Sequence, residues 1–152
     1  MKTETTPKWQ IKRFNELSTH ELYQLLGLRS EVFVVEQNCV YQDVDGKDTK
    51  ALHIFATQDE VVVAYARLFN EGDYFNECSI GRVVTAQRVR KQKIGHLLVA
   101  KSIEAIYTHF GMKTITISAQ EHLKNFYEQH GFVQTSNMYL EDDIPHIEMK
   151  KA

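Results

Sequence analysis

Four cations gather in one short segment of the chain, Arg88 to Lys93, and their position is unusual. The residues just before it, Cys78 to Thr85, are typical of a β-strand, and an apolar stripe with helical spacing begins near Gln92. Positive charge at the start of a helix opposes the helix dipole, at a cost of roughly 0.3–1 kcal/mol per group. A bound polyanion would reverse the sign of that interaction. We therefore expect a phosphate-bearing ligand here; the alternative is a solvated basic loop without a ligand.

A second segment, Ser118 to Phe132, carries a tyrosine suited to acid chemistry. It begins at the end of a predicted strand and contains a short predicted helix, Glu121 to His130, closed by Gly131. The hydroxyl of Tyr127 has a reference pKa of about 10 and can give a proton to a leaving group. The alternative is that Tyr127 packs in the core with its aromatic neighbours.

Both segments resemble known motifs. The run from Arg90 to Gly95 resembles the pyrophosphate-binding signature of the GNAT superfamily of acetyltransferases, with Lys93 where that family usually has glycine. The second segment resembles the other hallmark of that superfamily, a short helix ending in tyrosine, then three residues and Gly-Phe. Further stretches, Val32–Gln37 and Asp143–Ile147, are similar to the ElaA-like branch. The resemblance covers nearly the whole chain.

The resemblance implies an activity and a mode of binding. It implies transfer of the acetyl group of acetyl-CoA to a primary amine while both substrates are bound. It also implies that the strand before the basic loop splays from its neighbour, so that its backbone pairs with the pantetheine arm and polarises the thioester carbonyl. Lysine at 93 is compatible with a helical backbone, and its ammonium can reach the phosphates. The cofactor-binding residues expected on this basis are Val83, Val84, Thr85, Arg90, Lys91, Gln92, Lys93, Ile94, Gly95, His96 and Gln120, the last standing where the family often has asparagine.

Neither motif supplies a general base, and two candidates stay open. An alkylammonium must lose a proton before its nitrogen can attack a thioester. Glu36 ends the first predicted helix beside a polar loop; its alternative role is that of an ordinary carboxylate at a helix end. His146 lies near the last predicted strand and can titrate near neutrality; its alternative role is that of a surface or strand-pairing histidine. His53 is expected to be a strand residue with satisfied hydrogen bonds.

Acidic residues follow the first predicted helix and would border an acceptor pocket together with Glu36. They are Asp43, Asp45 and Asp48. Their charge suits a cationic amine, and the alternative is that they simply face water.

The composition narrows the function classes. With 18 Lys and Arg against 20 Asp and Glu, the formal net charge is −2, so no global field attracts nucleic acid or anionic membrane. A nucleic-acid module built on the cations at 88–93 lacks interleaved aromatic residues. Cys39 and Cys78 are far apart and form no metal-binding pattern, and no apolar run reaches the ~20 residues of a membrane span. We expect a cytoplasmic, metal-free protein; a non-catalytic acyl-CoA sensor stays open as the other function class.

The elements that position these residues are expected to form one α/β domain over residues 1–152. A capping box at Ser18 and Glu21 starts the first helix, which we expect to run to near Gln37. A hairpin precedes the strand–helix–strand unit, whose strands at 78–85 and 113–118 should be parallel. Further strands near both ends predict a mixed sheet of six or seven strands with helices on both faces. The resemblance makes this a GNAT-like fold with splayed central strands and leaves room for a homodimer.

Overall fold

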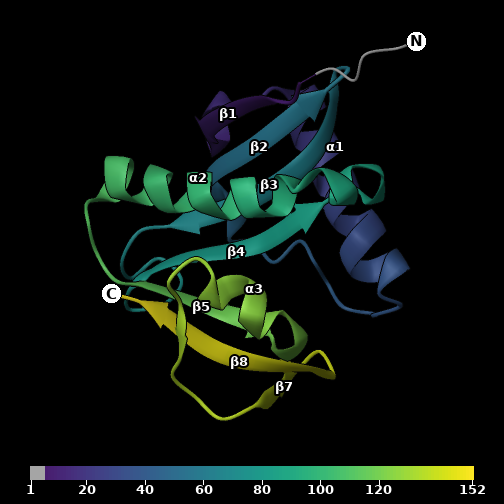
Figure 1. Cartoon of the computed structure of the whole chain (residues 1–152). Helices are drawn as coiled ribbons and strands as arrows, with labels where there is room; N and C mark the ends of the chain where they lie inside the picture. The colour runs from purple at the N-terminus through teal and green to yellow at the C-terminus, as the bar shows by residue number, and fades with distance from the viewer. Residues whose placement is uncertain (1–5) are drawn as a thin grey trace.

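The computed structural model describes residues 6–152 and shows a mixed sheet of eight strands with helices on both faces (Figure 1). The strand order is β1-β2-β3-β4-β5-β8-β6, and β7 also pairs with β8. Every pair is antiparallel except β4 with β5. The strands are β1 (Lys8–Arg13), β2 (Leu52–Gln58), β3 (Val61–Phe69), β4 (Cys78–Thr85), β5 (Ile115–Gln120), β6 (Val133–Gln134), β7 (Tyr139–Glu141) and β8 (Ile144–Lys151).

The first helix, α1 (Thr19–Arg29), begins at the predicted capping box. The Oγ of Ser18 accepts a hydrogen bond from the backbone amide of Glu21 at 3.0 Å, and the Glu21 carboxylate accepts one from the Ser18 amide at 2.8 Å. The helical stretch ends near Gln37, as expected, but its second half, Ser30–Glu36, is a π-helix, η2. Such segments are frequent at functional sites.

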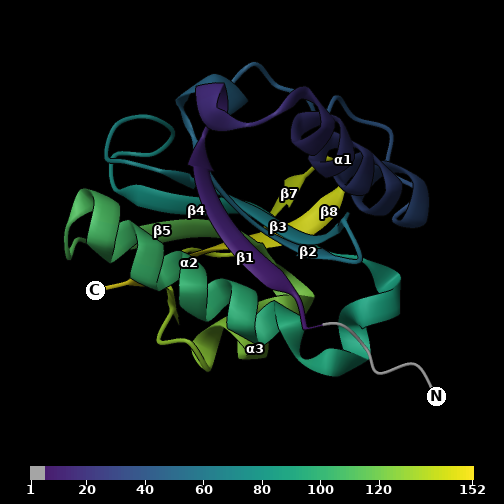
Figure 2. The ribbon, with the colours of Figure 1, turned by 90° about the horizontal axis from the view of Figure 1, so that it is seen from above.

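Helices cover both faces of the sheet, as expected (Figure 2). On one face, Leu25, Leu28 and Val32 pack against Phe55 and Tyr65. This core takes residues from β2, β3 and β4 but none from β5, β7 or β8. The half of this face that β5, β7 and β8 form is therefore free to line a cleft. On the other face, α2 (Ile94–Phe110) and α3 (Lys124–Glu128) cover the centre of the sheet.

The basic segment does not lead straight into a helix. Residues Gln87–Gln92 form a 3₁₀ helix, η4, and α2 begins only at Ile94. Between them, Lys93 adopts a left-handed conformation with φ 59° and ψ 23°. The helix start expected near Gln92 and the helical backbone expected for Lys93 are therefore both wrong. Glycine adopts this conformation without strain, and a lysine does not.

Strands β4 and β5 are parallel, as predicted, but they pair at only two positions. These are Cys78 with Ile115 and Ser79 with Thr116. Beyond them the strands diverge, as Figure 1 shows. Within residues 6–152, no strand pairs with β4 on this side from Ile80 onward. We call the gap between the diverging β4 and β5 the slot. Backbone amides and carbonyls are seldom left unpaired in a protein interior, so the slot suits an extended ligand that forms hydrogen bonds with those of β4.

The C-terminal part differs from the prediction in two elements. The helix expected at 121–130 is divided into a 3₁₀ turn, η5 (Glu121–Leu123), and α3. Strand β7 was not expected. It has only three residues, too few for the sequence to show the alternation of polar and apolar residues that is typical of a strand. It joins β8 through a two-residue turn, Asp142 and Asp143, with φ values of 51° and 62°. No helix in residues 6–152 is long and apolar enough to cross a bilayer.

Candidate active site

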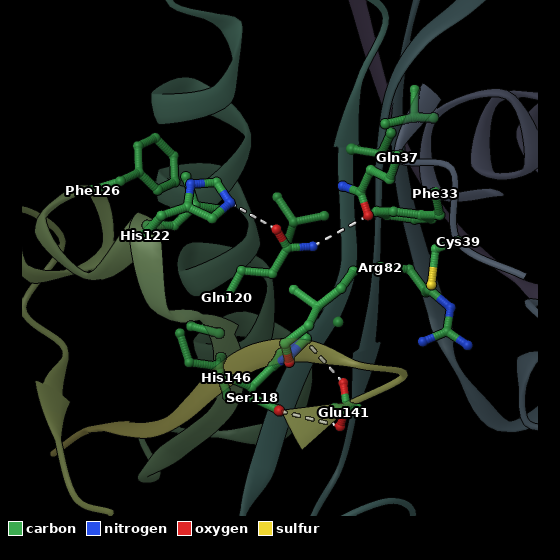
Figure 3. Close-up of a pocket in the computed structure, with 18 of the residues that line it drawn as sticks. Phe33, Gln37, Cys39, Arg82, Ser118, Gln120, His122, Phe126, Glu141 and His146 are labelled. Atoms are coloured by element: carbon green, nitrogen blue, oxygen red, sulfur yellow. Dashed lines mark hydrogen bonds and ion pairs between the residues drawn. The ribbon is translucent and has the colours of Figure 1, made fainter. Parts of the chain in front are cut away.

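A cleft of about 480 Å³ opens at the slot between β4 and β5 (Figure 3). It is lined from the α1 face by Val32 and Phe33 of η2, and from the opposite face by Gly95 and Phe126. The cleft therefore reaches both faces of the sheet. Two ligands can approach it from opposite sides and meet where the strands diverge.

Only part of the predicted cofactor set lines this cleft. The lining members are Val83, Val84, Thr85, Arg90, Gly95 and Gln120. The side chains of Lys91, Gln92 and Lys93 are exposed beside it, and that of Ile94 is buried in the core. The ring of His96 packs against Phe126, and its Nδ1 lies 2.9 Å from Nε2 of His130. These last five residues can serve a ligand mainly through backbone amides or through charge.

The first turn of α2 provides donors at one end of the cleft. The first amides of a helix have no partner within it, and no side chain caps this end of α2. Such a helix start binds phosphate or another anion. Gly95 faces the cleft here, and a Cβ at this position would be in ordinary contact, 3.7 Å, with the ring of Phe126.

Arg90 and Glu36 form an ion pair between η4 and η2. Arg90 Nη1 lies 2.7 Å from Glu36 Oε2, and Arg90 Nη2 donates to Glu36 Oε1 at 3.1 Å and to the Thr85 carbonyl at 3.2 Å. Both side chains are more than a third exposed. The structure thus pairs a residue predicted to bind pyrophosphate with a candidate base, and Glu36 is neutralised in this state.

Tyr127 lies in the core and lines the cleft as well. Its side chain is buried, and its ring packs edge-on against Phe126 and Phe132. Burial raises the pKa of Tyr127 well above its ordinary value. The hydroxyl is therefore protonated at neutral pH and can act as a hydrogen-bond donor.

Gln120 lies at the end of β5 where the slot is wide. Its Nε2 donates to Oε1 of Gln37 at 3.4 Å, and its Oε1 lies 2.8 Å from Nε2 of His122 (Figure 3). Both ends of the amide thus have side-chain partners. A pantetheine amide bound by Gln120 would have to replace one of them.

His146 lies on the side of the cleft near η2 and β7, in a network that joins three strands. Its Nδ1 is 2.7 Å from the carbonyl oxygen of Ile144, and its Nε2 is 3.3 Å from Oε2 of Glu141. Ser118 Oγ donates to Oε1 of Glu141 at 3.3 Å and lies 2.5 Å from the hydroxyl of Tyr139. The ring of Tyr139 stacks on that of His146. All of these polar groups except Tyr139 line the cleft.

The alternation along β5 and β8 shows which face carries this network. Ala119 and Ile147 point into the core under α2 and α3. Their neighbours Ser118 and His146 therefore point to the opposite face, the one that α1 partly covers. The structure separates the cleft into a side near α2 and α3 and a side near η2 and β7.

The predicted acidic wall of the acceptor pocket is wrong. Asp43 and Asp48 are buried and none of the three aspartates lines the cleft. Each is neutralised by arginine: Arg29 contacts Asp43 and Asp48 at 2.8 Å, and Arg67 contacts Asp45 at 2.6 Å. These ion pairs hold the loop after η2 against the sheet instead of facing an amine.

The other sequence-level expectations for polar residues can be compared directly. His53 is fully buried with its Nδ1 2.6 Å from the Tyr65 hydroxyl, which confirms a satisfied strand residue. Cys39 and Cys78 are free thiols, and Cys39 lines the cleft with its Sγ 3.4 Å from the Asp142 carbonyl. No group of three or more potential metal ligands occurs in residues 6–152.

Several polar residues in or beside the cleft were not singled out from the sequence. Arg82, Ser118 and Glu141 line the cleft, and Tyr139 contacts Ser118. Arg82 donates to Asp43 at 2.7 Å from a bulged position of β4 with φ 50°. Arg82 could have been recognised because it is a charged residue inside a mainly apolar strand. Ser118 could have been recognised because it alternates with core residues. Tyr139 and Glu141 lie on a strand too short to be predicted.

Comparison with known proteins identifies the family. A family model described as an acetyltransferase (GNAT) domain matches residues 15–152. The chain belongs to the GNAT acetyltransferase family. Protein ElaA of Escherichia coli (strain K12) is 42% identical to this GNAT protein over 146 residues, 95% of each chain.

Solved structures agree with this assignment. The crystal structure of Escherichia coli ElaA has a TM-score of 0.91 at 41% identity and covers 97% of this chain and 100% of that one. An acyl-CoA N-acyltransferase from Pseudomonas aeruginosa has a TM-score of 0.93 at 42% identity, with the same coverage. Membership of the GNAT family and these relatives support an acyl-CoA-dependent N-acyltransferase activity.

Proposed function

We propose that the chain is an N-acetyltransferase that moves the acetyl group of acetyl-CoA directly to a primary amine, with both substrates bound. The observation that carries this proposal is the cleft that passes between β4 and β5 and reaches both faces of the sheet. Acetyl-CoA enters from the side of α2 and α3, and the amine enters from the side of η2 and β7. Direct transfer requires such a meeting point, because the amine must reach the thioester carbon while the cofactor is held.

The cofactor side binds mainly through backbone. Pyrophosphate oxygens accept hydrogen bonds from the first amides of α2, and Arg90, Lys91 and Lys93 balance their charge. The pantetheine arm lies along the unpaired edge of β4, where Val83, Val84 and Thr85 offer amides and carbonyls. An amide of this edge polarises the thioester carbonyl and stabilises the negative charge that develops on its oxygen.

Two residues have the positions needed for proton transfer. Tyr127 lies on the cofactor side and donates a hydrogen bond to the departing sulfur. His146 lies on the acceptor side, where a proton must be removed from the amine. Glu36 is a weaker base candidate, since Arg90 already neutralises it.

The proposal also covers the domain organisation, the location, the assembly and the acceptor of the protein. Residues 1–152 form one domain, the protein acts in the cytoplasm, and family likeness leaves room for a homodimer. The acceptor is a small molecule or a peptide that carries a primary amine.

The first experiment measures thermal unfolding with and without millimolar acetyl-CoA, with AMP as a control. A ligand at ~100 times its dissociation constant adds about 2.7 kcal/mol of stability, which corresponds to roughly 5–10 °C for a chain of this size. A rise with acetyl-CoA and none with AMP supports the proposal and is followed by a screen of amines for thiol release. No shift with acetyl-CoA contradicts it, and binding without thiol release for any amine favours a non-catalytic acyl-CoA sensor.

A matched pair of variants at Gly95 locates the binding site. Gly95→Glu places a carboxylate at the start of α2, where it suits the helix dipole but repels pyrophosphate, whereas Gly95→Gln adds nearly the same volume without charge. The glutamate variant should remain folded and lose the acetyl-CoA shift, and the glutamine variant should keep more of it. Equal shifts in the two variants would contradict pyrophosphate binding at this helix end.

A further inference from the structure

Glu141 differs in its partners from Glu36 and from the aspartates of the loop after η2. Glu36 is paired with Arg90, and the aspartates of the following loop are paired with buried arginines. Among the ion pairs of residues 6–152, Glu141 pairs only with His146. Its side chain is 47% exposed and lines the cleft. Its negative charge therefore faces the acceptor side without a lysine or arginine to balance it.

The orientation of Glu141 is fixed by two neighbours. Ser118 donates to one carboxylate oxygen at 3.3 Å, and His146 Nε2 lies 3.3 Å from the other. Ser118 is itself held by the hydroxyl of Tyr139 at 2.5 Å. The carboxylate thus points at the imidazole with lone pairs left over on both oxygens, and Figure 3 shows this arrangement beside the slot.

The surroundings of His146 decide which ring nitrogen can act. A carbonyl oxygen only accepts, so Nδ1 must carry the proton that it shares with Ile144 at 2.7 Å. In the neutral ring, Nε2 then has a free lone pair on the side of Glu141. Once Nε2 gains a proton, both nitrogens donate to acceptors. The site therefore satisfies the imidazolium completely and leaves the neutral ring ready to take one proton.

We propose that the acceptor arrives as an alkylammonium, that Glu141 binds this cation, and that His146 Nε2 takes its proton. This inference rests on the proposed function, because it assigns the acceptor class and two roles within the same cleft. Glu141 and His146 are then catalytic residues. Ser118 and Tyr139 are positioning residues, because they act through Glu141 and the imidazole.

The proton balance of the step is complete. The ammonium gives one proton to His146, and the free nitrogen lone pair forms the C–N bond to the thioester carbon. The C–S bond breaks as the Tyr127 hydroxyl on the cofactor side gives its proton to the sulfur. The second nitrogen proton leaves after the C–N bond forms and, through solvent, restores the proton of Tyr127. The imidazolium releases its proton to solvent after the amide product departs. The net reaction is alkylammonium and acetyl-CoA to acetamide, thiol and one proton.

Other titratable groups near His146 come from the strands and turn packed around it. Tyr139 of β7 stacks on its ring, Glu148 follows two residues later on the same face of β8, and Asp142 lies in the connecting turn. Glu148 accepts a hydrogen bond from Thr135 at 2.7 Å. Among the carboxylates around His146, Glu141 is the one in contact with the imidazole. The test variants therefore remove the charge of Glu141.

The first test needs no acceptor. Nitrogen-15 NMR of the histidine rings in the full chain, assigned with His146→Gln, reports which nitrogen carries the proton in the neutral form. We expect the Nδ1–H tautomer for His146. The Nε2–H tautomer would leave no lone pair for the ammonium proton and would overturn the proposal.

The second test compares two small amines as probes in a thiol-release assay with acetyl-CoA near pH 9. Propylamine is protonated there, like a lysine side chain, whereas hydrazine is mostly neutral and needs neither an anion nor a base before it attacks. His146→Gln should lower turnover with propylamine by ~100-fold, the usual contribution of a general base. Glu141→Gln should lower it as well, because the ammonium loses its counter-charge, while turnover with hydrazine falls by less than about threefold in both variants. An equal loss with both amines would show a merely structural role and overturn the inference.

Wild-type protein that binds acetyl-CoA but releases no thiol with either amine would contradict the proposed function itself, while the tautomer measurement would still decide on the pair.

Discussion

Replacing Lys93 with glycine tests the left-handed turn between η4 and α2. A residue with a Cβ loses roughly 1–2 kcal/mol in this conformation compared with a right-handed one. The ammonium also lies at the positive end of α2, which adds about 0.3–1 kcal/mol of repulsion when no anion is bound. Lys93→Gly removes both effects, while the greater freedom of glycine in the unfolded chain offsets about 0.5–1 kcal/mol.

The matched control is Lys93→Ala, which removes the charge and keeps the Cβ. The difference between the two variants isolates the backbone strain, and we expect Lys93→Gly to be about 1 kcal/mol more stable than Lys93→Ala. That corresponds to roughly 2–4 °C in the thermal midpoint. Urea unfolding without ligand gives the free energies, provided that the slopes agree among the variants.

The affinities of Lys93→Gly and Lys93→Ala for acetyl-CoA provide a second measurement at this turn. Both lack the ammonium, so a tighter complex for Lys93→Gly measures how far the Cβ limits approach of a phosphate to the loop. If Lys93→Gly is no more stable than Lys93→Ala, residue 93 does not adopt φ near 59° in solution, and the strain argument is refuted.

Three further variants test separate parts of the site. Glu36→Gln removes the partner of Arg90 and should tighten acetyl-CoA binding about two- to fivefold, as expected for an exposed ion pair, in isothermal titration calorimetry; unchanged or weaker binding would show that Arg90 does not turn to the cofactor. Tyr127→Phe should lower turnover by at least ~10-fold and leave the acetyl-CoA dissociation constant nearly unchanged, and wild-type turnover would remove Tyr127 from the acid role. Burial opposes ionisation of Asp45, but the hydrogen bonds and charge of Arg67 outweigh it and hold the pKa of Asp45 well below its usual range. Because the unfolded chain takes up this proton near pH ~4 and the folded chain only at lower pH, the stabilisation is present above pH ~4 and is lost as the pH falls further, so the urea midpoint should fall less steeply with acid in Asp45→Asn than in wild type.

Local sequence signals predicted the parts of this fold that depend on neighbouring residues. The capping box at Ser18, the hairpin of β2 and β3 and the bounds of β4 follow from side chains within a few positions of one another. The break after Arg29 into a π-helix and the left-handed Lys93 were not predictable in this way. Both depend on how distant segments meet around the cleft, and a helical pattern of apolar residues does not reveal them.

The candidate site divides along the same line. The segment proposed to bind the cofactor, 83–96, was singled out because it is continuous in sequence and has an unusual charge pattern. On the side proposed for the acceptor, Ser118, Glu141 and His146 come from three strands, and only His146 was a candidate. The three aspartates assigned to this side are neutralised by arginines that lie far from them in the sequence, and charge counting along the chain could not pair them.

The end of η2 lies across the wide mouth of the slot and restricts how molecules can enter it. Glu36 reaches Arg90 beside the end of β4, and Gln37 reaches Gln120 at the end of β5. Two separate substrates can avoid these bridges by entering from opposite faces. A bisubstrate inhibitor has the acceptor linked covalently to coenzyme A. To bind, it must either break both the Glu36–Arg90 and the Gln37–Gln120 contacts or pass one of its halves through the slot from one face of the sheet to the other. Such a compound should associate slowly and dissociate slowly, so its residence time would be long even at modest affinity.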